Sequence, residues 1–258
     1  MIRAERLSDD DQQISGRNIW YAYIETNPNS EWFNTGAYID TLNKKAVSRF
    51  IETTHEVYAD ALSDMFGSTV PSIFTDEPQF AHKTGLKEAT DTSDVFLPWT
   101  TNLGKSFSQT YGYDLLDRLP ELIWDVQQKS TTSPSTLTRY HFHNHVCETF
   151  VDAFMDNIAI WCKEHKIMLC GHMMREPTLR SQTEAIGEAM RCYRSLDVPG
   201  VDMLSDAFEF NTVKQCSSVA RQNGARGVMS EICKPPLSLA LFCLILTELC
   251  RRRNKLDV

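Results

Sequence analysis

The stretch SIFTDEPQF (Ser72–Phe80) passes from an apolar run directly into two adjacent acids and a proline. Its apolar first half predicts a buried strand over 69–75, with a proline near the start, where a missing N–H is tolerable. An ordinary turn does not need adjacent carboxylates. Asp76 and Glu77 therefore indicate that the end of this strand presents acids to a chemical site.

The same rhythm of strand and helix recurs along the chain. Hydrophobic periodicity predicts helices over 43–66, 138–165, 178–196 and 212–222, and strands over 18–26, 69–75, 166–174, 201–207 and 225–232. Strands that alternate with helices through short connections are typical of a parallel sheet with crossover helices. A long irregular stretch at about 79–135 interrupts this pattern, and its segment 111–125 predicts short helices.

Acids and a histidine follow the predicted strands. In order along the chain they are Glu25, Asp76, Glu77, His172, Glu176, Asp206 and Glu231. The carboxyl ends of the strands in a parallel β/α barrel open onto one face, so these side chains are expected to converge there. An open doubly wound sheet also gathers strand ends. No glycine-rich fingerprint follows the first strand, so a dinucleotide-binding fold has no support.

Composition narrows the function classes. With 258 residues, 42% of them hydrophobic, the chain can bury the core of one large domain or two small ones. The net charge is −8 with no long basic stripe, which argues against nucleic-acid binding. Eight scattered cysteines without a CxxC pair indicate reduced, mostly buried thiols. The polar, acidic first fifteen residues are unlike a signal peptide, so a cytoplasmic location is expected. The sequence indicates no oligomeric state.

Six segments together resemble glycoside hydrolase family 106, the α-L-rhamnosidase type. They are GAYIDTLNKKAVSRFIETTHEVY, VPSIFTDEPQF, LPWTTNLGKSFSQTYGYDLLDRLPEL, WCKEHKIMLCGHMM, VDMLSD and ARGVMSEI. The resemblance covers roughly residues 19–232. It implies a (β/α)8 barrel, a carbohydrate substrate, a pair of catalytic carboxylates, inverting hydrolysis and often a bound calcium.

The resemblance also predicts an incomplete barrel. The five predicted strands correspond to about strands three to seven, with 18–26 and 225–232 as open edges. The expected organisation is a polar segment 1–17, a partial barrel 18–233 and an atypical apolar and basic tail 234–258. The apolar part of the tail is too short to span a bilayer. It is interpreted as a helix covering a sheet edge, a membrane-surface anchor or a translation artefact.

Glycosidic cleavage needs a carboxylic acid that protonates the leaving oxygen and a second carboxylate that activates water or attacks the anomeric carbon. Glu77 is the candidate acid, because burial beside aromatic residues raises the pKa of a carboxyl group. Glu231 is the candidate base and Glu176 the alternative. Asp76 either binds a sugar hydroxyl or fixes the geometry of Glu77.

The remaining candidates bind substrate. His172 binds a hydroxyl or a charged neighbour, or is a buried structural histidine. Glu25 and Asp206 are candidates for hydroxyls or for calcium, which favours hard oxygen ligands. Trp20 stacks on a sugar or packs in the core.

Two other interpretations stay open. The chain is a glycoside hydrolase domain, or an inactive barrel fragment that acts at most as an interaction module. His141, His143 and His145 raise a zinc hypothesis, but only the outer two share a helix face. A solvated helix start is the stronger interpretation of the three.

Overall fold

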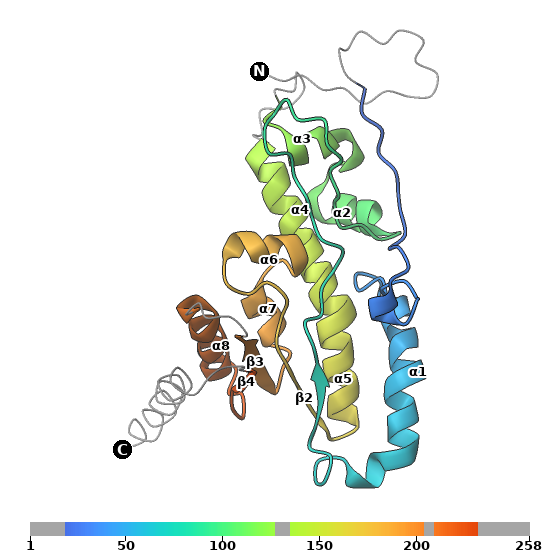
Figure 1. Ribbon diagram of the computed structural model, residues 1–258, viewed down its shortest axis with the longest axis vertical. Helices are drawn as coiled ribbons and strands as arrows, with labels where there is room; N and C mark the ends of the chain where they lie inside the picture. Colours follow the sequence, from blue (N-terminus) through green and yellow to red (C-terminus); the bar gives the residue numbers. More distant parts are fainter. Residues whose placement is uncertain (1–18, 127–134, 204–208, 232–258) are drawn as a thin grey trace.

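The structure is a computed structural model that describes residues 19–126, 135–203 and 209–231 (Figure 1). The segment 1–17, the tail 234–258 and Asp206 lie outside the described residues, and so do the expectations attached to them. Within the described ranges, no helix is both long and apolar enough to cross a membrane.

Four short parallel strands form the sheet, in the order β1 (Ser72–Thr75), β2 (Met168–Gly171), β3 (Val198–Asp202) and β4 (Met229–Glu231). They fall within four of the five predicted strands or overlap them. The two inner strands are the more deeply buried, as expected for strands that have a neighbouring strand on each side.

The helical elements connect and cover these strands. They are η1 (Glu31–Phe33), α1 (Lys44–Leu62), η2 (Ser63–Met65), α2 (Leu103–Tyr111), η3 (Leu116–Arg118), α3 (Leu119–Ile123), α4 (Ser135–Phe150), the π-helical η4 (Val151–Asp156), α5 (Asn157–Glu164), α6 (Leu179–Ala185), α7 (Ala189–Tyr193) and α8 (Phe210–Gln222).

The helix α1 begins as the sequence predicts. The Asn43 side chain accepts hydrogen bonds from the backbone N–H groups of Lys45 and Ala46, which satisfies two of the free donors at the helix start. Its buried residues, Val47, Ile51, His55 and Ala59, recur every four positions. This spacing gives one apolar stripe, and α1 packs with it against η4 and α5.

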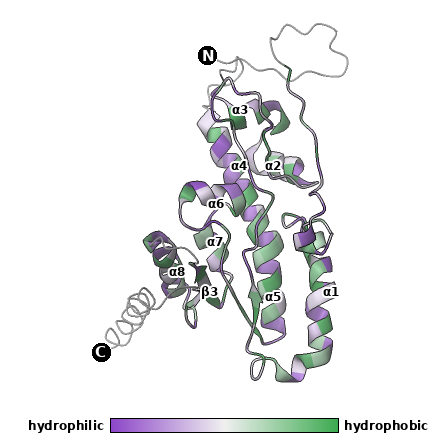
Figure 2. Cartoon of the chain, viewed as in Figure 1, coloured by the Kyte–Doolittle hydropathy of each residue, from purple (hydrophilic) through white to green (hydrophobic). Residues whose placement is uncertain are grey.

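The predicted long helix over 138–165 is confirmed as the continuous series α4, η4 and α5 (Figure 1). Its lower part packs against α1 and β2, and Figure 2 shows the α5 ribbon largely in hydrophobic green. Its upper part packs against α2 and α3, the short helices of the irregular stretch 79–135. The series therefore joins the sheet to that insertion.

The helices cover one face of the sheet. The side chains of Ile73, Leu169 and Val201 belong to the core or pack against it, and they stand on β1, β2 and β3. Because side chains alternate along a strand, Phe74, Cys170 and the residues in the matching phase point to the other face. Phe74 is accordingly exposed.

The strand order follows the chain order without a reversal. A doubly wound sheet reverses its strand order at a switch point, and the described sheet has none. Because parallel connections are right-handed, successive neighbouring strands place their crossover helices on the same face. The other face is left for the polar residues at the strand ends.

The predicted strand over 18–26 is wrong for the residues that the structure describes. Residues 19–28 run as an extended segment without strand pairing, and Tyr21, Tyr23 and Ile24 are exposed. The aromatic and β-branched composition favoured a strand, but β propensity measures the fit to a pleated, half-buried surface. Here the segment has no strand partner, and β1 takes the edge position expected for it. In the described sheet, β4 stands at the opposite edge.

Gly171 controls the pairing of β1 with β2. Its φ is +151°, and an added Cβ would lie 2.1 Å from the carbonyl oxygen of Thr75. We expect Gly171→Ala to lower the free energy of unfolding by about 2 kcal/mol or more, because overpacking alone costs roughly 1–3 kcal/mol. Urea unfolding measures this change. Gly227→Ala is the matched control, since a Cβ there meets no atom within 4 Å. Equal midpoints for both variants would contradict the close approach.

Candidate active site

A fully buried histidine stands at the centre of the polar cluster at the strand ends. Nε2 of His172 lies 3.1 Å from Oε2 of Glu231, with which it forms a hydrogen bond, and 3.3 Å from Oδ1 of Asp76. The carboxylates of Glu77 and Asp202 also approach this histidine. One carboxylate oxygen of Glu77, one of Asp202 and one ring nitrogen of His172 all lie within 4.8 Å of one another. Four carboxylates thus surround one imidazole.

Strand register explains the convergence. Thr75 pairs with Gly171, so the next residues, Asp76 and His172, leave neighbouring strands at the same level. Asp202 pairs directly with Glu231. All these positions continue the alternation of the face opposite the helices, where the ring of Phe74 contacts the His172 ring at a centroid distance of 5.4 Å.

The cluster changes the acidity of its members. Burial raises the pKa of Glu77; His172 opposes this shift, and the carboxylates of Asp202, Asp76 and Glu231 add to it. Burial likewise raises the pKa of Asp202, against the effect of His172 and with that of Glu231. Both carboxyl groups therefore hold a proton more tightly than a solvated acid does.

Two features mark the cluster as a site rather than ordinary packing. Nδ1 of His172 and Oδ1 of Asp202 are buried and have no hydrogen-bond partner among the described residues. Glu77 has a φ of +41°, a backbone conformation that residues other than glycine adopt at a cost in free energy. Unpaired buried polar atoms and backbone strain are both typical of positions that bind a ligand.

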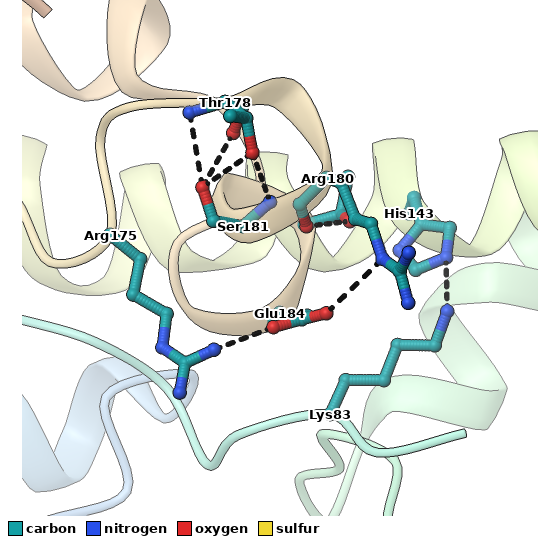
Figure 3. A network of polar contacts seen from close by, with 8 residues as sticks. Lys83, His143, Arg175, Thr178, Arg180, Ser181 and Glu184 are labelled. Carbon is teal, nitrogen blue, oxygen red and sulfur yellow. Dashed lines mark hydrogen bonds and ion pairs between the residues drawn. The ribbon is translucent and has the colours of Figure 1, made fainter. Parts of the chain in front are cut away.

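The loops after β1 and β2 are fixed to each other beside the cluster. Backbone N–H groups of Phe80 and Lys83 donate to the carbonyl oxygens of Ala185 and Glu184, at 2.8 and 2.9 Å. Figure 3 shows Glu184 between Arg175 and Arg180, at N–O distances of 2.6 and 3.8 Å.

The same region contains a helix cap. Thr178 and Ser181 close the start of α6 with reciprocal hydrogen bonds, also drawn in Figure 3. The α6 helix therefore holds the β1 loop and the β2 loop in one frame, and Asp76, Glu77 and His172 stand at the bases of these loops.

Not every predicted residue reaches this cluster. Glu176 is buried in the turn after β2, and its side chain accepts hydrogen bonds from the Met173 N–H and the Tyr193 hydroxyl. Trp20 lies in the extended segment and packs edge-to-face on Trp124. Glu25 lies in the same segment, outside the sheet. The expectation that Trp20 and Glu25 stand at a strand end is therefore wrong.

Asp202 is the member of the cluster that the sequence reading missed. The segment 201–207 contains two acids, and the predicted strand ends at the second, Asp206. The structure ends β3 at Asp202, because the strand begins earlier, at Val198. Pro199 and Gly200 argued against a strand there. A usable signal for Asp202 was the apolar Val201 immediately before it, which is a core residue.

The three histidines of α4 have separate partners. His141 hydrogen-bonds the hydroxyl of Tyr113, Lys83 donates to His143 at 2.9 Å, and His145 hydrogen-bonds Ser106. Burial and the nearby Lys83 and Arg139 lower the pKa of His143 to about 4, so this imidazole is a neutral acceptor. Their side chains serve packing between the insertion and α4.

The cluster is open rather than enclosed. The side chains of Asp76 and Glu231 are 74% and 50% exposed. A hollow of about 670 Å³ lies elsewhere, between the extended segment and α2, where Ile24, Trp99 and Tyr113 are among its lining residues. The cluster at His172 is the candidate site, because it combines titratable groups with buried polar atoms that have no partner among the described residues.

Fold and site together define a class: a parallel α/β domain that gathers carboxylates at the carboxyl ends of successive strands. The profile of glycoside hydrolase family 106, described as alpha-L-rhamnosidase, matches residues 24–231. The chain belongs to this family.

Among solved structures, the rhamnosidase from Novosphingobium sp. PP1Y is similar in fold, with a TM-score of 0.55 and 18% sequence identity. The match covers 76% of this chain and 17% of that rhamnosidase, so the chain spans only a small part of that protein's length. No curated protein matches the chain.

The family resemblance implies a bound calcium ion, and the carboxylates of the cluster offer oxygen atoms that could bind one. Asp76, Glu77, Asp202 and Glu231 supply carboxylate oxygens, which hard divalent cations favour, and Oδ1 of Asp202 is buried without a partner among the described residues. These carboxylates, rather than the imidazole nitrogen, fit the ion. Glu25, a candidate for hydroxyls or for calcium, is not among them.

We expect calcium to stabilise the protein through this cluster. A ligand that binds only the folded state adds about 2.7 kcal/mol at a concentration of a hundred times its Kd. Thermal unfolding in EDTA and in excess calcium measures the effect. Asp76→Asn combined with Glu231→Gln should abolish it, whereas Glu52→Gln combined with Asp60→Asn, two exposed acids of α1, should not. If calcium stabilises the Asp76→Asn, Glu231→Gln variant as much as wild type, calcium does not bind at this cluster.

Proposed function

We propose that this chain is the catalytic part of an enzyme that cleaves the O-glycosidic bonds of α-L-rhamnosides. The observation that carries the proposal is the convergence of Asp76, Glu77, Asp202 and Glu231 on the buried His172. Membership of the rhamnosidase family supports rhamnose as the sugar of the proposed substrate. A pair of carboxyl groups across a sugar ring is what glycoside hydrolysis requires.

We further propose that the four strands are part of a (β/α)8 barrel. Support comes from the strand order without reversal and from the helices on one face of the sheet. In such a barrel the opposite face lines the interior, and the carboxyl ends of the strands hold the active site. The cluster at His172 has this position.

In the proposed mechanism Glu77 is the general acid. Its carboxyl group gives a proton to the leaving glycosidic oxygen while the bond to the anomeric carbon breaks. The raised pKa of Glu77 supports this role, because an acid must still hold its proton near neutral pH. The left-handed backbone at Glu77 also supports a functional role, because such strain is concentrated at functional sites.

Glu231 is the proposed general base. Its half-exposed carboxylate can take a proton from a water molecule as the water oxygen attacks the anomeric carbon, which gives inversion, the outcome that the family resemblance implies. The hydrogen bond from His172 would orient this carboxylate. Asp76 and Asp202 are proposed to bind sugar hydroxyls.

Asp76, Asp202 and the ionised Glu231 would hold a calcium ion, since Glu77 keeps its proton in this mechanism. When bound, the ion would supply positive charge that offsets carboxylate repulsion.

The general acid gives the sharpest test of the proposed reaction. Glu77→Gln keeps the size of the side chain but removes the transferable proton, so hydrolysis of an unactivated alkyl or disaccharide rhamnoside should fall by about 10²–10⁴-fold. An aryl rhamnoside with a good leaving group needs little protonation and should lose less. Initial rates on both substrates measure the difference, with Glu52→Gln as the matched control. Cleavage of the unactivated rhamnoside at the wild-type rate by Glu77→Gln would overturn the assignment.

A further inference from the structure

The turn after β2 contains a buried carboxyl group that the proposed reaction does not use. Glu176 is 3% exposed, and its Oε1 accepts hydrogen bonds from the backbone N–H of Met173, at 2.7 Å, and from the hydroxyl of Tyr193. Tyr193 is itself buried, on α7. Both donors therefore depend on this one oxygen for a partner.

The backbone of Glu176 is fixed as firmly as its side chain. Its carbonyl oxygen accepts a hydrogen bond from Nε2 of Gln182 at 2.6 Å, and Gln215 of α8 donates to it at 3.4 Å. Gln182 is fully buried, and its Oε1 accepts the N–H of Ala189 at the start of α7. Residues of α6, α7 and α8 thus all hydrogen-bond to Glu176 in the turn after β2.

The surroundings of Glu176 favour its neutral form. It makes no ion pair with a lysine, arginine or histidine in the part of the chain that the structure describes. Burial raises its pKa to about 8, against the lowering effect of the Tyr193 and Met173 hydrogen bonds. The other titratable groups facing it are Glu209 before α8, Asp202 at the end of β3 and Cys216 on α8. None of these stabilises a carboxylate.

We propose that Glu176 is a positioning residue: as a neutral carboxylic acid, it holds the peptide between His172 and Met173 and thereby sets the orientation of His172 toward Glu231. The N–H that it binds belongs to this planar peptide group, so holding it fixes the backbone torsion that follows His172. Glu176 does not touch the carboxylate cluster. This role rests on the proposed function only for its effect on catalysis.

Two substitutions separate this role from that of a catalytic base. Glu176→Gln replaces a neutral acid with a neutral amide whose oxygen accepts the same two hydrogen bonds, so kcat should stay within about threefold of wild type. Glu176→Ala leaves two buried donors unpaired and should lower kcat at least about tenfold with a smaller change in KM. Rhamnoside hydrolysis measures both, and the 15N resonances of the His172 imidazole should shift in the alanine variant but not in the glutamine variant.

The pH dependence of stability tests the neutral acid without any enzyme assay. Because the pKa rises from the ordinary 4.5 to about 8 on folding, the folded state binds the proton more tightly. The stability that this adds is complete below about pH 4.5 and is lost as the pH rises through about 8. The urea midpoint of wild type should therefore fall more steeply between pH 5 and 8 than that of Glu176→Gln, which lacks the titrating group.

The outcomes are distinguishable. If wild type hydrolyses no rhamnoside, the proposed function fails, while the urea midpoints and the His172 resonances still decide the role of Glu176. If Glu176→Gln loses activity as fully as Glu77→Gln, Glu176 is a catalytic base and the positioning role is overturned. The positioning role is also overturned if the urea midpoints of wild type and Glu176→Gln have the same pH dependence, or if Glu176→Ala leaves the His172 resonances unchanged.

Discussion

The hydrogen bond between His172 and Glu231 depends on the whole sheet. It connects the end of β2 to the end of β4 across β3, so it forms only when all three strands keep their register. Gly200 of β3 makes this approach possible. An added Cβ there would lie 2.7 Å from the Gly171 carbonyl oxygen and 2.6 Å from Cγ of Met229. Glycine permits close approach of the neighbouring strands.

This arrangement has an electrostatic cost. Four carboxylates near one imidazole repel each other, and this repulsion adds to the effect of burial, which is the larger cause of the raised pKa values of Glu77 and Asp202. The repulsion is relieved by a proton, by a cation or by hydroxyl groups of a bound sugar. Clusters that lower stability in this way are common at functional sites. The frame around α6 joins the loops after β1 and β2, from whose bases Asp76, Glu77 and His172 extend.

Much of the fold follows from local sequence patterns. The helix α1 was predictable from its Asn43 cap and apolar stripe, and β1 from an apolar run that ends in acids. The segment 18–26 was not, because its aromatic residues fit a strand but nothing local tells whether a partner strand is available. Asp202 was missed since Pro199 and Gly200 hid the start of β3. The sequence places Glu176 just after β2. It does not show which way the Glu176 side chain points, because that depends on its contact with Tyr193, which is distant in sequence.

The most direct test of the account is a double-mutant cycle between β2 and β4. His172→Phe keeps a ring but removes the donor, Glu231→Ala removes the acceptor, and urea unfolding of both single variants and the double variant gives their coupling. We predict a favourable coupling of at least about 0.5 kcal/mol, because residues in direct contact are not energetically independent. Free energies that add to within about 0.3 kcal/mol would contradict the contact on which the proposed active site depends.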